Sequence, residues 1–310
     1  MRILVTGGGG FIGRAIVKEL INQGHEVTIT ASGTDFVVPG VKKILYMGLD
    51  GIDWEYLNGQ EAVIHQMANN DTRCTDADEM WRANVDGPKK LFMKAAELGC
   101  KRFVYASSTA VYGNSPAPYI EDETPIDPLN PYARSKAVFD QEAKKMAKNC
   151  GLSIIGLRYC NVYGPGEKHK GKRKSMVGQI IDKLDDFTDM YEKTTVKLFK
   201  PGDNKRDWLY VSDAVQANML ALEKTAQEDY FNIFNVGSGE SRSFNDILSV
   251  LNGLIKSNHW EIEPDYIDCP FPDEYQWYTE CDIKKIREEL GYSPRFNLES
   301  GIKDYLINDI

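Results

Sequence analysis

A glycine-rich turn near the N-terminus constrains the fold more than any other feature of the sequence. An apolar run, Arg2–Thr6, leads directly into glycines spaced three apart within 7–13, and apolar residues with helical spacing follow at 11–22. Such glycines allow a sharp strand-to-helix turn, a close approach of the backbone to a pyrophosphate and tight helix–strand packing. The helix N-terminus then favours phosphate. The expected dinucleotide contacts in this turn are Gly7, Gly10, Phe11, Ile12 and Gly13.

Short apolar runs alternate with helical patterns over residues 1–160. We expect strands at 2–6, 27–30, 43–46, 62–65, 103–106 and 153–157, and helices at 11–22, 76–98 and 132–148. Near-continuous apolar strands separated by helices indicate parallel βαβ units whose sheet is covered on both faces. The sequence therefore predicts an α/β fold with a doubly wound parallel sheet of the Rossmann type.

The pattern changes after Gly164. Further helices are expected at 176–184, 213–224, 244–255 and 283–290, and short strands at 196–199 and 208–211. A chain of 310 residues is long enough for two lobes. We expect residues 1–165 to form a dinucleotide-binding domain to which segments near 208–240 return. Residues 166–310 are expected to form mainly a smaller C-terminal α/β lobe for the substrate.

The overall charge excludes one class of function. The chain has 37 Lys and Arg residues against 46 Asp and Glu residues, so its formal net charge is −9. A general nucleic-acid binder needs a basic face, so we expect no nucleic-acid partner. A locally basic pocket for an acidic or phosphorylated small ligand is compatible with this balance.

Neither a membrane nor a metal partner is expected. No stretch approaches the roughly 20 apolar residues of a membrane helix, and no signal peptide is visible. The six cysteines form no CxxC pair, and the four histidines do not stand at ligand spacing from them. We therefore expect a soluble, cytoplasmic protein with reduced cysteines.

A serine, a tyrosine and a lysine are arranged for acid–base chemistry. Ser108 follows the expected strand 103–106, at the sheet edge where ligands bind. Tyr132 and Lys136 are four residues apart on an expected helix and so share a face. A phenol has a pKa of about 10, and a nearby ammonium together with an oxidised nicotinamide favours its phenolate. We expect Tyr132 to be the base and Ser108 to hydrogen-bond the reacting oxygen, with Tyr132 and Lys136 also contacting the cofactor.

Together these motifs resemble the extended short-chain dehydrogenase/reductase family, which includes the nucleotide-sugar epimerases and dehydratases. The segment 84–87 (Asn-Val-Asp-Gly) resembles that family's asparagine motif on its long fourth helix. The segment 157–165 resembles its substrate-loop motif, and 205–208 resembles the segment whose arginine holds a diphosphate.

This resemblance implies site residues, a cofactor and an assembly. Asn84 is implied at the cofactor, and Asn161 and Arg206 at a nucleotide-sugar substrate. A tightly bound NAD or NADP is implied, and a homo-oligomer is the usual assembly in the family. The remaining expected cofactor contacts are Ser32, Asp50 and Met67.

The end of the second strand bears on the choice of cofactor. A Rossmann strand usually ends there in a carboxylate that binds the ribose 2′-hydroxyl, but this chain has Ala31. Without that negative charge a 2′-phosphate is not repelled, which favours NADP over NAD. No arginine stands nearby in the sequence; the nearest cations are Lys42 and Lys43, and Asp35 is an alternative acceptor for the ribose.

The residues after Ser108 bear on the reaction. Dehydratases of this family place an Asp-Glu pair there, whereas this chain has Thr109 and Ala110. The missing acid/base pair favours an epimerase, in which the substrate is transiently oxidised by NAD(P)+ and then reduced again.

A second resemblance narrows the substrate. The segments similar to the ADP-glycero-manno-heptose 6-epimerase group are 164–171, 175–176, 199–211, 270–273, 275–276 and 278–279. In that group a lysine of the HKG loop, here Lys170, serves as a second acid/base at the substrate. We expect the basic run 168–174 to lie over the sugar-nucleotide pocket, and Tyr275 to bind the substrate. The chain departs from the group at Glu274, where arginine is common, and in the insert 172–174.

Other activities stay open on the sequence alone. The main alternative is an NDP-hexose 4-epimerase of the UDP-glucose 4-epimerase kind. A nucleotide-sugar dehydratase or decarboxylase, a reductase with net cofactor turnover and a non-catalytic NAD(P) sensor are the others. Such sensors commonly lose the tyrosine or the lysine, and this chain has both.

Overall fold

The structure is a computed structural model of the chain. It describes residues 1–31, 40–45, 54–71, 74, 76–148, 150–187, 193–224, 230–256 and 260–308. None of the helices in these ranges combines the length and apolar character that crossing a bilayer requires.

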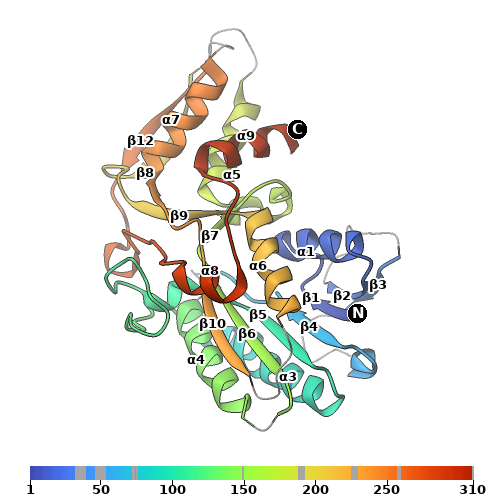
Figure 1. Ribbon diagram of the computed structural model, residues 1–310. Helices are drawn as coiled ribbons and strands as arrows, with labels where there is room; N and C mark the ends of the chain where they lie inside the picture. The colour runs from blue at the N-terminus through green and yellow to red at the C-terminus, as the bar shows by residue number, and fades with distance from the viewer. Residues whose placement is uncertain are drawn as a thin grey trace.

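A seven-stranded parallel sheet forms the centre of the described fold (Figure 1). Its strand order is β3-β2-β1-β4-β5-β6-β10. The strands are β1 (Arg2–Thr6), β2 (Glu26–Ala31), β3 (Lys42–Leu45), β4 (Ala62–His65), β5 (Arg102–Ser108), β6 (Ser153–Tyr159) and β10 (Phe231–Val236). The chain winds outward from β1 to β3 and then returns to β4, so the winding direction reverses between β1 and β4. Ligands of doubly wound sheets bind beyond the carboxyl ends of the strands at such a reversal.

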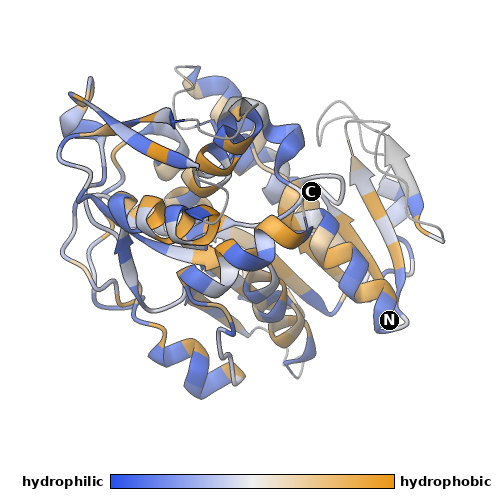
Figure 2. Ribbon diagram, turned by 90° about the horizontal axis from the view of Figure 1, so that it is seen from above, coloured by the Kyte–Doolittle hydropathy of each residue, from blue (hydrophilic) through white to orange (hydrophobic). Residues whose placement is uncertain are grey.

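Helices cover both faces of this sheet, so its strands are apolar on both sides. On one face lie α1 (Phe11–Asn22), α6 (Val211–Glu223) and α8 (Lys284–Leu290), and on the other α3 (Gly87–Glu97) and α4 (Pro131–Met146). Along β1, Ile3 and Val5 pack toward the first face and Leu4 toward the second. Figure 2 shows the apolar strands beneath these helices. The predicted Rossmann-type fold is confirmed.

A second hydrophobic core lies above the carboxyl edge of the sheet in the view of Figure 1. Its helices are α5 (Met176–Ile181), α7 (Phe244–Ile255) and α9 (Leu298–Asn308). Its strands are β7 (Asn161–Tyr163), β9 (Lys205–Tyr210) and β11 (Ser241–Ser243) in one sheet, and β8 (Lys193–Phe199) and β12 (Glu261–Ile267) in another. Phe11 belongs to this core although it is the first residue of α1. The glycine-rich turn therefore contacts both cores.

The expected helix at 76–98 is helical but not uniform. It consists of α2 (Ala77–Trp81), a π-helical segment Arg82–Asp86 and α3. Pro88 has no N–H to donate to the carbonyl four residues back, which breaks the α-helical ladder at Asn84. Such π-helical segments are frequent at functional sites.

Several elements of the second half lie outside the sequence prediction: β7, β10, β11, β12 and α9. Most of these strands are short or irregular in pattern, and β12 contains Pro264 on an edge strand, where the missing N–H is tolerated. The short 3-10 turns are Trp54–Leu57, Thr109–Tyr112, Lys168–Arg173, Asp182–Asp186 and Pro272–Glu274.

A buried ion pair supports the inner side of α4. Arg158 Nε on β6 donates to Asp140 Oδ2 on α4 at 2.9 Å, and both side chains are under a tenth exposed. Tyr105 donates to the other carboxylate oxygen at 3.0 Å. Arg158 Nη1 also donates to Tyr112 Oη at 2.7 Å, and its cation lies 5.0 Å from the centre of that ring. The pair thus ties α4 to β5, β6 and the turn after β5.

We predict that Asp140→Ala lowers the free energy of unfolding by about 3–5 kcal/mol, because it leaves the Arg158 cation buried without its partner. Urea titration followed by tryptophan fluorescence measures this loss. The control is Glu142→Gln on the same helix, whose partners Lys89 and Lys145 are more exposed; it should cost much less. Equal losses in the two variants would contradict the account.

Candidate functional site

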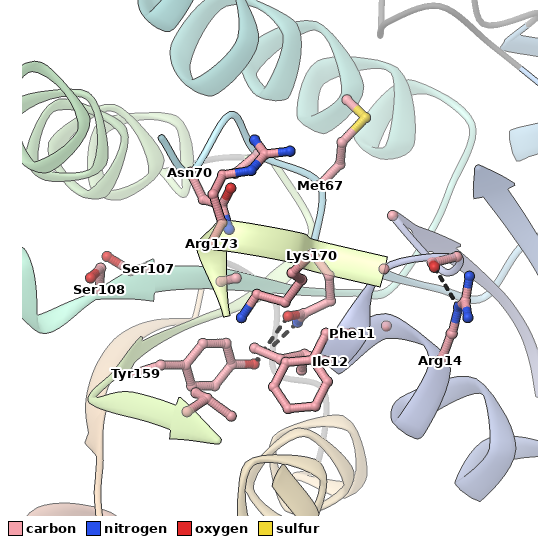
Figure 3. A pocket seen from close by; sticks show the side chains of 18 of the residues that line it. Phe11, Ile12, Arg14, Met67, Asn70, Ser107, Ser108, Tyr159, Lys170 and Arg173 are labelled. Carbon is pink, nitrogen blue, oxygen red and sulfur yellow. Dashed lines mark hydrogen bonds between the residues drawn. The ribbon is translucent and has the colours of Figure 1, made fainter. Parts of the chain in front are cut away.

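A cavity of about 570 Å³ lies at the carboxyl ends of β1, β4, β5 and β6 (Figure 3). The sequence-predicted residues that line it are Gly7, Gly10, Phe11, Ile12, Gly13, Met67, Ser108, Tyr132, Lys136, Asn161 and Lys170. These residues come from six separate segments of the chain, and the fold brings them to one place.

The glycine-rich turn is packed too closely for side chains. Gly7 has φ +69°, and a Cβ atom there would lie 2.9 Å from the backbone nitrogen of Met67. A Cβ atom on Gly13 would lie 2.1 Å from the Gly7 carbonyl oxygen. Gly10 is the N-cap of α1, so no side chain competes with a ligand for the N–H groups of the first turn. This cradle fits the pyrophosphate of a dinucleotide.

The first turn of α4 places Tyr132 and Lys136 at the cavity. Asn130 caps the helix by accepting a hydrogen bond from the backbone of Ala133 at 2.9 Å, and Pro131 starts it. Lys136 Nζ lies 5.9 Å from the centre of the Tyr132 ring. It donates to the carbonyl oxygen of Ala106 at 2.8 Å, which orients the amine along β5.

Burial governs the protonation of this pair. It raises the pKa of the Tyr132 phenol, and a hydrogen bond with Ser108 opposes that rise. Burial lowers the pKa of Lys136 to about 8, with the Asp140 carboxylate acting in the other direction. Ser108 Oγ accepts a hydrogen bond from the backbone of Ala110 at 3.2 Å, so its own proton is available for a ligand or for Tyr132.

His65, at the end of β4, is a buried neutral residue next to this group. Its Nδ1 atom lies 2.6 Å from the Thr6 hydroxyl. Burial, followed by the charge of Lys136, lowers the pKa of His65 to about 3. The imidazole therefore joins the ends of β1 and β4 without carrying charge at neutral pH.

Lys170 reaches the cavity from the basic loop. Its Nζ atom lies 2.9 Å from Glu167 Oε2 and 4.9 Å from the centre of the Phe11 ring. Figure 3 shows Lys170, Phe11, Tyr159 and Ser108 around the same hollow.

Asn84 is not in the cavity wall. Its amide donates to the carbonyl oxygen of Asn69 at 2.8 Å and to Ser135 Oγ at 3.0 Å, and it accepts from the backbone nitrogen of Asn69 at 2.8 Å. It therefore joins the segment after β4, which includes the cavity residues Met67 and Asn70, to α4. The geometry places Asn84 behind the expected cofactor site rather than in contact with the cavity.

Arg206 and Tyr275 lie together, but not in the wall of this cavity. The Arg206 guanidinium lies 4.9 Å from the Tyr275 ring and 5.7 Å from the Phe244 ring. The Tyr275 hydroxyl accepts from Asn204 at 2.7 Å. Burial lowers the pKa of Arg206. Within the described residues no carboxylate is in ion-pair range of Arg206, so its cation is available to an anion.

The corner of the cavity near β2 holds an arginine that sequence reasoning missed. Arg14 and Ala31 both line the cavity, and Arg14 Nε donates to the carbonyl oxygen of Gly9 at 2.6 Å. Lys42 pairs in register with Thr28, toward the amino end of β2, and its amine lies over the Tyr56 ring. No arginine is near Ala31 along the chain, but Arg14 reaches the same cavity wall from α1. Ser32, Asp35 and Asp50 lie outside the described residues, as does the side chain of Lys43.

Other cavity residues also escaped the sequence analysis. Gln66 and Tyr159 follow or end central strands, and Asn218 on α6 donates to the Tyr159 hydroxyl at 2.6 Å. Gln66 donates to the same hydroxyl at 3.1 Å. His169 and Arg173 belong to the basic loop. The sequence could have indicated Gln66 and Tyr159 by their positions at strand ends. It could have indicated His169 and Arg173 by their positions in the basic loop.

A buried cluster beside the cavity consists of Cys160, Asp207 and Cys281, whose ligand-type atoms lie within 4.8 Å of one another. The Asp207 carboxylate already accepts hydrogen bonds from the backbone and hydroxyl of Ser238 and from the backbones of Gly239 and Cys281. The lone pairs of the carboxylate are therefore occupied by hydrogen bonds that join β9 to the segments around Ser238 and Cys281. We assign this cluster no metal.

Comparison with known proteins defines the class of protein. Residues 3–237 match the model of the NAD dependent epimerase/dehydratase family, and the chain belongs to that family. The family expected from the motifs is confirmed.

Particular relatives are similar over nearly the whole chain. The chain is 34% identical to ADP-L-glycero-D-manno-heptose-6-epimerase of Brachyspira hyodysenteriae over 321 residues, covering 98% of this chain and 96% of the relative. It is similar to the structure of UDP-glucose 4-epimerase from Thermotoga maritima with UDP-glucose, at 27% identity, TM-score 0.85 and coverage of 99% and 98%. It is also similar to MoeE5 in complex with UDP-glucuronic acid and NAD, at 26% identity, TM-score 0.87 and coverage of 99% and 98%.

We predict that acidification destabilises the protein through His65. Between pH 6.5 and about 3 the unfolded chain binds a proton that the folded chain does not, so stability rises with pH across that window and is lost as the pH falls. The full shift corresponds to about 5 kcal/mol. Urea titrations at several pH values should show a shallower acid slope in His65→Gln than in the wild type. His25→Gln, at a more exposed site where burial also lowers the histidine pKa, is the control and should change the slope less than His65→Gln; an unchanged slope in His65→Gln would contradict the assignment.

Proposed function

We propose that this protein is a nucleotide-sugar epimerase that oxidises its substrate transiently with bound NAD(P)+ and reduces it again. The observation that carries the proposal is the convergence of Ser108, Tyr132, Lys136 and Lys170 on the cavity that the glycine-rich turn also lines. When bound, the nicotinamide cofactor supplies acceptance and return of the electron pair.

The residues of the chain handle the proton. Tyr132 removes it from the sugar hydroxyl, and Ser108 hydrogen-bonds the reacting oxygen. Because burial raises the pKa of Tyr132 in the free site, the phenolate requires positive charge nearby, which Lys136 and the oxidised cofactor provide. Lys170 is the second acid/base, which protonates the oxygen when the sugar is reduced from its other orientation.

Similarity to the Brachyspira enzyme supports an NDP-heptose 6-epimerase. The Thermotoga structure supports the alternative, an NDP-hexose 4-epimerase. Elimination of water is disfavoured because Thr109 and Ala110 replace the acidic pair, and the Thr109 hydroxyl donates to the carbonyl oxygen of Tyr159 at 3.2 Å.

We further propose that residues 1–165 bind the dinucleotide and that 166–310 mainly bind the nucleotide sugar. The uncompensated cation of Arg206 is suited to the diphosphate, with Tyr275 beside it and Asn161 at the cavity. A homo-oligomer is the assembly that we expect from the family, and light scattering of the purified protein tests it.

For the cofactor we propose NADP in preference to NAD. Ala31 presents no carboxylate at the cavity wall, and the Arg14 guanidinium lies at the same wall through its bond to Gly9. Among the described residues at this wall, a 2′-phosphate would meet the Arg14 cation. NAD is the cofactor bound to MoeE5, so the two dinucleotides must be compared directly.

We predict that Tyr132→Phe and Lys170→Met each lower the rate of inversion by about 10²–10⁴-fold, because each removes a proton-transfer group. Proton NMR of candidate NDP-heptoses and NDP-hexoses measures inversion at one carbon. An epimerase gives no net change in the absorbance of reduced nicotinamide, whereas a reductase does. Full activity of Tyr132→Phe would remove Tyr132 as the base, and full activity of Lys170→Met would remove Lys170 from the mechanism. Dinucleotide binding without inversion of any nucleotide sugar by the wild type would indicate a sensor.

We predict that Ala31→Asp weakens NADP binding at least about tenfold, because it places a negative charge beside the 2′-phosphate, and leaves NAD binding nearly unchanged. Arg14→Gln should also lower the affinity for NADP relative to that for NAD. Isothermal titration with both dinucleotides measures the ratio of affinities. Lys42→Met is the control at the other end of the strand pair. A wild type that binds NAD more tightly than NADP would refute the preference.

A further inference from the structure

Glu167 is a fully buried carboxylate to which the proposed proton transfers assign no role. Its Oε1 atom accepts from the Ser175 hydroxyl at 2.7 Å and from the Gly164 backbone at 3.3 Å. Its Oε2 atom accepts from the Ser175 backbone at 2.7 Å and from Lys170 Nζ at 2.9 Å. A buried carboxylate is retained only when it is paired and hydrogen-bonded in this way.

These four contacts make Glu167 a fixed point in the basic loop. Gly164 belongs to the substrate-loop motif, and Ser175 is the N-cap of α5. Two of the donors are backbone N–H groups on either side of the loop, and the third is the hydroxyl that also caps α5. These three donors fix the position of the carboxylate. The Oε2 atom, which already accepts from the Ser175 backbone, also accepts a hydrogen bond from the Lys170 amine.

Lys170 depends on such a fixed partner. A lysine amine is a point charge on a flexible four-carbon stem and does not hold one position by itself. The amine lies between Glu167 Oε2 and the ring of Phe11, which is buried and forms the start of α1. Ion pair and cation–ring contact together hold it at the cavity wall.

We propose that Glu167 is the positioning residue that holds Lys170 Nζ at the cavity for its transfer of a proton to the substrate. This inference rests on the proposed function, in which Lys170 is the second acid/base. Glu167 touches neither the cavity nor its contents, since it is absent from the lining, so it acts through Lys170.

The same loop contains a matched control. Lys174 Nζ lies 2.6 Å from Asp182 Oδ1, and this lysine is not among the cavity residues. Asp182→Asn therefore removes a carboxylate partner from a loop lysine without altering Lys170. Glu167→Gln makes the corresponding change at the proposed positioning residue.

The first experiment measures the freedom of the amine without cofactor or substrate. The full-length protein is treated briefly with acetic anhydride, and acetylation of each lysine is read by peptide mass spectrometry, normalised to Lys145, which is 72% exposed. Glu167→Gln should raise acetylation of Lys170 several-fold, and Asp182→Asn should raise that of Lys174 instead. Unchanged acetylation of Lys170 in Glu167→Gln would overturn the inference. If that variant does not fold, Glu167→Asp keeps the buried charge but shortens its reach, and the same result is expected.

The second experiment separates positioning from substrate binding. In Glu167→Gln the kcat for inversion should fall by about tenfold to a hundredfold, because the amine is misplaced, while KM stays near the wild-type value. Asp182→Asn should retain the wild-type kcat. If Lys170→Met abolishes inversion but Glu167→Gln inverts normally, this inference fails and the proposed function stands. If the wild type inverts no nucleotide sugar, the proposed function fails, while the acetylation result still reports whether Glu167 holds Lys170.

Discussion

The contact between Gly13 and the carbonyl of Gly7 is the constraint on which the rest of the structure depends. A single methyl group on Gly13 would lie 2.1 Å from that oxygen, so only glycine allows α1 to start this close to β1. Because β1 is an inner strand between β4 and β2, and α1 contacts both β2 and α6, the position of α1 affects these elements as well. Phe11, in the same turn, extends into the second hydrophobic core. One close backbone approach therefore sets both the dinucleotide cradle and the joint between the two halves of the molecule.

Most of the buried titratable side chains described above have a defined partner. His65 is neutral and hydrogen-bonded to the Thr6 hydroxyl, and the Lys136 amine donates a hydrogen bond to the carbonyl oxygen of Ala106. Glu167 neutralises Lys170, and Asp140 neutralises Arg158. Arg206 differs, since aromatic rings surround it and no carboxylate of the described chain neutralises it. Charges left uncompensated in a protein interior are characteristic of sites that receive a charged ligand.

The sequence predicted structural elements correctly where a local pattern is compatible with few backbone conformations. Glycines at 7–13 after an apolar run, and a tyrosine and a lysine four residues apart, identify their elements by local geometry alone. Prediction was weaker where side chains from distant segments meet. Asn84, which was expected at the cofactor, does not line the cavity, and its amide in the π-helical segment donates to the backbone of Asn69 instead. Nothing in the sequence indicated Arg14 as a cation near Ala31, because the residues that neighbour Ala31 along the chain follow β2, whereas Arg14 lies on α1.

By itself the sequence determined the alternation of strands and helices, the glycine-rich turn and the candidates for acid–base residues, because these features depend on spacing within a single element. Only the tertiary structure decided which residues share the cavity. The placement of β4, β5 and β6 side by side in the sheet brings Gln66, just after β4, beside Tyr159 at the end of β6, although the two are 93 positions apart. Burial likewise exists only after folding, so the protonation of His65 and Lys136 and the pairing of Glu167 with Lys170 follow from packing rather than from residue type.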